Sequence, residues 1–121
     1  MPCVHEFAIL PPGEPGPEDG SCYERYDGRD YALWQDSEML LPVEDDLFLP
    51  VLDRMPPVRV VWPGNCWAEC LAWTGITLIP PESCGVLARC LEEEREPSLA
   101  ALHALASQAQ EEGRWILHFG V

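Results

Sequence analysis

The sequence contains no lysine: all seven of its basic residues are arginine, against 21 acidic residues. The formal net charge of the 121-residue chain is therefore −14. Nucleic-acid binding needs cations that replace the counterions on phosphate, and a negative field repels both the phosphate backbone and anionic membrane surfaces. The charge predicts no nucleic-acid and no membrane partner. It favours a basic protein partner, although an acidic surface also serves solubility alone.

Long apolar runs are missing as well. No run approaches the ~20 residues that a membrane-spanning helix needs. The first residues lack a basic region, and the short apolar stretch after them ends at Pro11, so we expect no signal peptide and a cytoplasmic protein. With 47% hydrophobic and 23% charged residues, the composition is typical of a soluble globular protein. We expect a single globular domain over residues 1–121.

Cysteine is abundant, but its spacing is not that of a structural zinc site, which usually carries two closely spaced pairs. Cys66 and Cys70 have three residues between them, whereas Cys84 and Cys90 have five. In a chain without an export signal, such cysteines are expected to be reduced and mostly buried as small apolar side chains. We therefore expect no metal and no cofactor. We expect most of the five tryptophans in the core as well.

The first half of the chain is interrupted by proline and glycine. Residues 3–10 predict a strand, and residues 11–20 an exposed Pro/Gly-rich loop. Asp27-Gly28 indicates a hairpin between strands 22–26 and 31–34. A short or bent helix is predicted over 43–54, because Pro50 disfavours a regular helix interior.

The second half has clearer signals for regular structure. Residues 66–73 fit either periodicity, and we interpret them as a strand that continues after Gly75 into 76–79. Two helices and two further strands are predicted on either side of that segment: strand 58–62, helix 82–96, helix 98–112 and strand 114–119. Because helices and strands cluster instead of alternating, the predicted class is α+β, with a mainly antiparallel sheet and two C-terminal helices packed on it.

One short motif suggests cysteine chemistry. The stretch 64–68, Gly-Asn-Cys-Trp-Ala, resembles the segment around the active cysteine of papain-like proteases. That resemblance implies a nucleophilic Cys66 at a helix start, with His103 or His118 as general base. No glutamine shortly before Cys66 supplies an oxyanion donor, and neither Asn nor Asp follows His118. A small cysteine-dependent hydrolase using Cys66 and His118 is thus an alternative to a non-enzymatic protein.

The acidic residues form two dense clusters. The first suits the positive end of a helix dipole, whereas the second falls where the predicted helix 82–96 ends and anions are unfavourable. Arg89 and Arg95 lie within a turn of the second cluster and offset part of its charge. A cluster that breaks a local rule can mark a functional surface, and a solvated helix face is the other interpretation. The candidate binding residues are Glu44, Asp45, Asp46, Glu92, Glu93, Glu94 and Glu96.

Two further segments carry a general resemblance. Residues Gly75–Ser83 and the segment Ile116–Val121 are similar in style to the small acidic immunity proteins that bacteria make against toxins. The resemblance implies an inhibitor that occludes the active site of a basic toxin or enzyme. The leading hypothesis is therefore a non-enzymatic protein-binding module with an acidic surface. A structural protein that forms a homo-oligomer is a further alternative.

Overall fold

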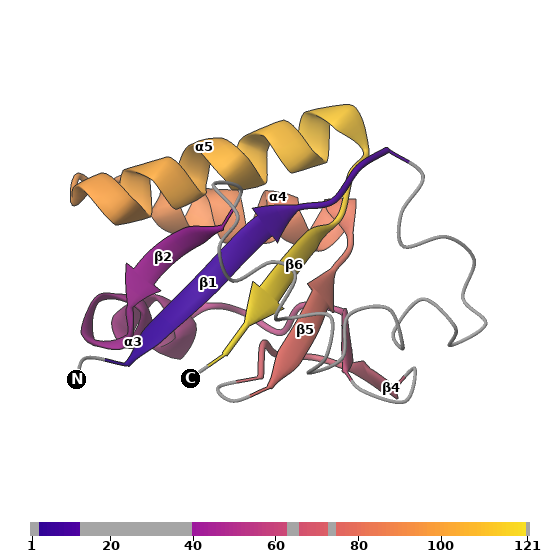
Figure 1. Ribbon diagram of the computed structural model, residues 1–121, viewed down its shortest axis with the longest axis horizontal. Coiled ribbons are helices and arrows are strands. Elements are labelled where there is room, and N and C mark those ends of the chain that lie inside the picture. The colour runs from indigo at the N-terminus through magenta and orange to yellow at the C-terminus, as the bar shows by residue number, and fades with distance from the viewer. Residues whose placement is uncertain (1–2, 13–39, 63–65, 73–74, 121) are drawn as a thin grey trace.

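A computed structural model describes residues 3–12, 40–62, 66–72 and 75–120 of the chain (Figure 1). The predicted hairpin of residues 22–34 and most of the predicted loop 11–20 lie outside the described residues. The strands are β1 (Val4–Ile9), β2 (Leu41–Glu44), β3 (Val60–Trp62), β4 (Cys66–Ala68), β5 (Ile76–Ile79) and β6 (Ile116–Phe119). The helices are α3 (Asp45–Arg54), α4 (Pro81–Leu91) and α5 (Pro97–Glu112).

The strands form one sheet in the order β2-β1-β6-β5-β3-β4, and every neighbouring pair is antiparallel. This arrangement confirms the predicted α+β class with an antiparallel sheet. The first and last strands of the chain, β1 and β6, lie side by side, and Phe7 is directly opposite His118. Residues far apart in the sequence therefore share the centre of the sheet.

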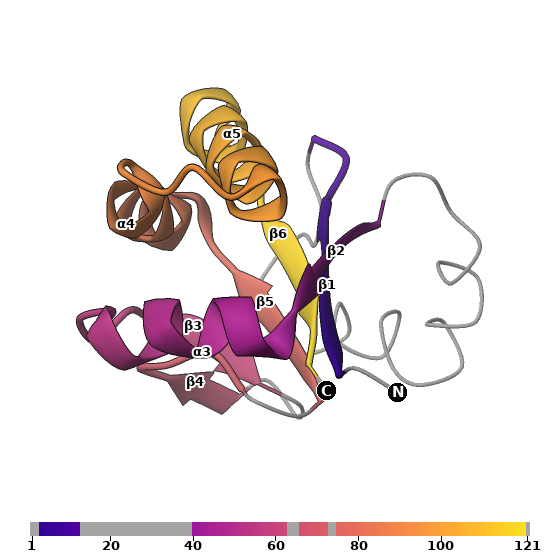
Figure 2. The same ribbon diagram turned by 90° about the vertical axis from the view of Figure 1, so that its left-hand side faces the viewer.

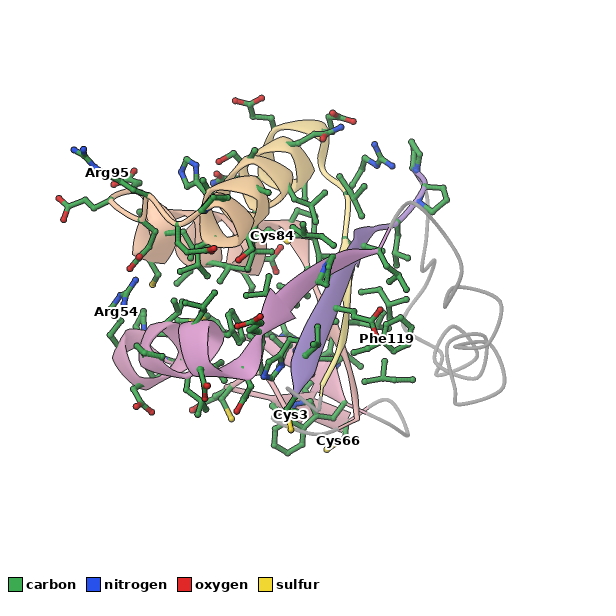
Figure 3. All side chains as sticks on the ribbon, turned by 60° about the vertical axis from the view of Figure 1, so that its left-hand side comes forward. Cys3, Arg54, Cys66, Cys84, Arg95 and Phe119 are labelled. Carbon is green, nitrogen blue, oxygen red and sulfur yellow. The ribbon has the colours of Figure 1, made fainter. Side chains whose placement is uncertain are left out.

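The three helices cover one face of the sheet (Figure 2). Between them and the sheet lies the larger hydrophobic cluster, which includes Phe7, Phe48 and Leu102. A smaller cluster with Leu117 and Phe119 forms on the opposite face. Figure 3 shows this separation, with Cys84 in the helical layer and Phe119 beyond the sheet. The two C-terminal helices, α4 and α5, pack on the sheet, as predicted, and they also pack on each other.

Local sequence signals account for the ends of the two long helices. Pro81 occupies the first turn of α4, and Pro97 that of α5, where a missing N–H costs no helical hydrogen bond. Gly113 follows α5 with φ 65°, the left-handed conformation that glycine adopts most easily. These predicted boundaries are confirmed.

Other predicted boundaries were wrong. Helix α4 ends at Leu91, before the acidic run, so that run belongs to the connection between α4 and α5 and not to a helix. Residues 66–79 do not form one strand, because β4 and β5 pair with opposite sides of β3. Strand β2 was not predicted. Pro50 lies inside α3.

The described cysteines and tryptophans are less buried than we predict from the sequence. Of the five described cysteines, only Cys84 is buried, and Cys3, Cys66 and Cys70 are exposed. The described tryptophans, Trp62, Trp67 and Trp115, are half-buried against the edges of the two clusters. Amphipathic rings placed at the border of a core keep the indole N–H within reach of a partner; that of Trp62 donates to the Cys70 carbonyl. Within the described ranges, no helix is long and apolar enough to cross a membrane.

Candidate functional site

Helix α3 and the connection between α4 and α5 bring the two acidic clusters to one edge of the molecule. At one end of α3, Arg54 forms an ion pair with Glu94, N to O 2.6 Å. At the other end, Glu44 and Glu96 line the same hollow. Figure 3 shows Arg54 and Arg95 projecting from the same side of the molecule. We call this surface the acidic edge: Glu44, Asp45, Asp46, Glu92, Glu93, Glu94 and Glu96.

Two members of the acidic edge have structural partners. The guanidinium of Arg54 holds Glu94 and also donates to the Cys90 carbonyl at 2.8 Å. Glu96 caps α5 by accepting from the backbone N–H groups of Ser98 and Leu99, at 2.9 and 3.2 Å. A hydrogen bond from the Ser98 hydroxyl to the same carboxylate is the main cause of the lowered pKa of Glu96. These two carboxylates therefore fix the connection between α4 and α5.

Four other members face solvent. Glu44, Asp46, Glu92 and Glu93 are exposed, and their carboxylates have no hydrogen-bond or ion-pair partner among the described residues. Glu92 and Glu93 line a second hollow, which they share with Arg54 and Arg89.

The outer face of α3 adds an apolar side chain to this acidic surface. Leu49 is 37% exposed, and it is the only exposed large hydrophobic side chain among the described residues. Residues three and four apart share one face of a helix. The exposed residues at this spacing are Asp46, Leu49, Pro50 and Asp53. An apolar contact flanked by carboxylates is thus presented beside the acidic edge.

Asp45 is a third member of the acidic edge with a structural partner, and it is mostly buried. Its side chain is only 13% exposed, and Oδ1 lies 2.7 Å from Nε2 of His5 on β1. Nδ1 of His5 lies 2.9 Å from Nε2 of His118 on β6. Both imidazoles are completely buried. The result is a hydrogen-bonded chain that runs from the acidic edge into the centre of the sheet.

The hydrogen-bond partners fix the tautomers of this chain. We assign His5 as donating from Nε2 to Asp45, so its Nδ1 accepts from the Nε2–H of His118. Nδ1 of His118 then carries a lone pair, and it has no partner among the described residues. The reverse tautomer would bury an unpaired N–H. Burial, with the neighbouring His5 ring, lowers the pKa of His118 from 6.5 to about 3, so His118 is neutral.

Aromatic rings enclose the two imidazoles. Phe48 of α3 lies 4.9 Å from the His5 ring and 6.1 Å from the His118 ring, between centroids. Phe7 of β1 stacks on His118 at 4.8 Å. Helix α3 therefore supplies both the carboxylate that binds His5 and the ring that covers the pair.

The structure does not bring Cys66 and His118 together. Cys66 begins the edge strand β4, and β6 is three strands away, about 14 Å at the usual strand spacing. Cys66 also starts a strand instead of a helix, so no helix dipole acts on its thiol. Nε2 of His118 is bound to His5, and His103 lies half-buried on α5. The described residues provide no group of His, Cys, Asp and Glu side chains that could hold a metal ion.

The histidine pair was missed in the sequence. The alternation of His5 with Phe7 places both on one face of a strand, but nothing local shows that this strand pairs with residues 116–119. No family model matches the chain, and no curated protein and no solved structure is significantly similar to it.

Proposed function

We propose that this protein is a non-enzymatic binding module that recognises a basic protein partner through the acidic edge and the outer face of α3. What supports this function is that two clusters far apart in the sequence share one edge. The edge carries seven acidic side chains, with three arginines beside them: Arg54, Arg89 and Arg95. The excess of four negative charges attracts a cationic surface and raises its rate of encounter.

The same surface suggests the chemistry of the partner. Exposed carboxylates suit arginine or lysine side chains, and Leu49 beside them suits an apolar contact. A partner of this kind is a basic enzyme or toxin whose active site the acidic edge would cover. The cysteine-hydrolase and homo-oligomer alternatives have no comparable arrangement in their favour among the described residues.

A matched pair of charge variants tests this function. The edge variant is Glu92→Gln/Glu93→Gln. The control variant is Glu82→Gln/Glu111→Gln, which changes net charge equally at exposed positions near the start of α4 and the end of α5. Affinity for an arginine-rich peptide is measured by isothermal titration calorimetry at low and high salt.

We expect the peptide to bind more weakly as salt rises, because exposed charges are screened. At low salt the edge variant should lose about fivefold in affinity, from roughly 0.5 kcal/mol for each exposed charge. The control should lose less than about twofold, since Glu82 and Glu111 lie at the ends of α4 and α5 that are remote from the connection between these helices. Equal losses in the two variants, or binding independent of salt, would contradict the proposal.

A further inference from the structure

The chain Asp45–His5–His118 ties three elements together at one point. Asp45 belongs to the first turn of α3, His5 to β1 and His118 to β6. The backbone N–H of Asp45 also donates to the Cys3 carbonyl at 2.8 Å. The start of α3 is thus joined to the first strand by a side-chain and a backbone hydrogen bond.

A proton added to His118 has no hydrogen-bond acceptor in the closed structure. Protonated imidazole donates from both nitrogens, yet Nδ1 of His118 is buried without an acceptor among the described residues. Water can reach Nδ1 of His118 only if the side chains packed over the imidazole move, and these include Phe48 of α3. Burying an unpaired charge is costly, so the protonated state favours a conformation with α3 lifted from the sheet.

Beyond the Asp45–His5–His118 chain, the described surroundings contain no group placed to accept this proton. Glu6 precedes Phe7 on β1 and points to the opposite face by strand alternation. Glu44 and Asp46 flank Asp45 on the solvent side. The side chains contributed by the remaining elements are Val43 of β2, Thr77 of β5, the apolar buried residues of α5, and on α4 the Cys84 thiol, whose pKa burial raises to about 12.

We infer that the Asp45–His5–His118 chain is a proton-sensitive latch that holds α3 on the sheet at neutral pH and releases it on acidification. Release would separate Asp46 and Leu49, which move with α3, from Glu92 and Glu93, which stay on the connection between α4 and α5. Acidification would thus take the acidic edge apart. This regulation of binding rests on the proposed function, whereas the release of α3 does not.

The pH range over which α3 is released follows from the binding of one proton to His118. The lifted state exposes an ordinary imidazole with pKa 6.5, whereas the closed state takes up the proton only near pH 3. The equilibrium constant for lifting α3 should therefore rise up to about tenfold per pH unit below pH 6.5. Between pH 6.5 and 5.5 exposed carboxylates stay ionised, so a change there isolates the histidine.

Amide hydrogen exchange of α3 measures this constant directly. The full chain is followed by NMR between pH 7.5 and 5, and rates are corrected for intrinsic exchange. In the wild type, the opening constant of α3 should rise about fivefold from pH 6.5 to 5.5, while that of α5 stays within about twofold. A rise shared equally by α3 and α5, or no rise in α3, would overturn the latch.

The variant His118→Gln removes the titration and keeps a side-chain donor and an acceptor for His5. Its α3 opening constant should be flat over this range. The control variant His103→Gln changes a half-buried residue of α5 that does not belong to the hydrogen-bonded chain Asp45–His5–His118. It should respond like the wild type. Should His118→Gln not fold, the wild-type comparison of α3 with α5 still decides the inference. An arginine-rich peptide that fails to bind at every pH refutes the proposed function but leaves the latch intact.

Discussion

Replacing His118 by glutamine should flatten the dependence of global stability on acid pH. His118 is neutral in the fold, and its pKa is lowered from 6.5 to about 3. Below pH 6.5, His118 therefore binds a proton in the unfolded chain but not in the folded chain. The stabilisation from this residue is fully present above pH 6.5 and is lost as the pH falls toward 3. The whole difference amounts to about 5 kcal/mol, at 1.36 kcal/mol per pKa unit.

Urea unfolding followed by tryptophan fluorescence at pH 7.5 and at pH 4 measures this loss. Over that interval the wild type should lose about 3 kcal/mol more in free energy of unfolding than His118→Gln. Carboxylates whose pKa is lowered by hydrogen bonds, such as Glu96 and Glu112, also weaken the fold in acid. They do so equally in both proteins, and their effect cancels in the comparison. Parallel losses in wild type and variant would refute the role given to His118.

Two further predictions concern the frame around the site. Gly113→Ala should lower the free energy of unfolding by about 1 kcal/mol, because φ 65° strains any residue with a Cβ while no atom crowds the position; Gly113→Asn should lose less, and urea midpoints compare the two. A thiol reagent at pH 7 should modify Cys3, Cys66 and Cys70 but spare Cys84, which is buried with its pKa raised to about 12. Mass spectrometry locates the adducts, and modification of Cys84 as fast as Cys66 in the folded chain would contradict its burial.

The fold was predictable where the signal is local. Pro81 and Pro97 each begin a helix, and Gly113 ends one, because each of these residues restricts or permits its own backbone angles. The short strands depended on their neighbours. Residues 41–44 contain Pro42 and show no strand periodicity of their own, yet they pair with β1. The alternation in residues 66–79 predicts one continuous strand, because alternation does not reveal which side of β3 each part joins.

The candidate site was only half predictable. The acidic residues themselves are evident from composition, but their roles depend on contacts that no local pattern encodes. Asp45 looked like its neighbours and is in fact bound to His5. Glu96 caps α5. The histidine pair was invisible because it joins the two ends of the chain.

The central claim is that one edge of this molecule receives a cationic partner. Chemical-shift mapping with an arginine-rich peptide at neutral pH and low salt tests it most directly. The perturbed amides should concentrate in residues 44–54 and 92–96, around exposed Leu49. Perturbations spread evenly over the surface, or centred on β4 or the end of α5, would contradict it.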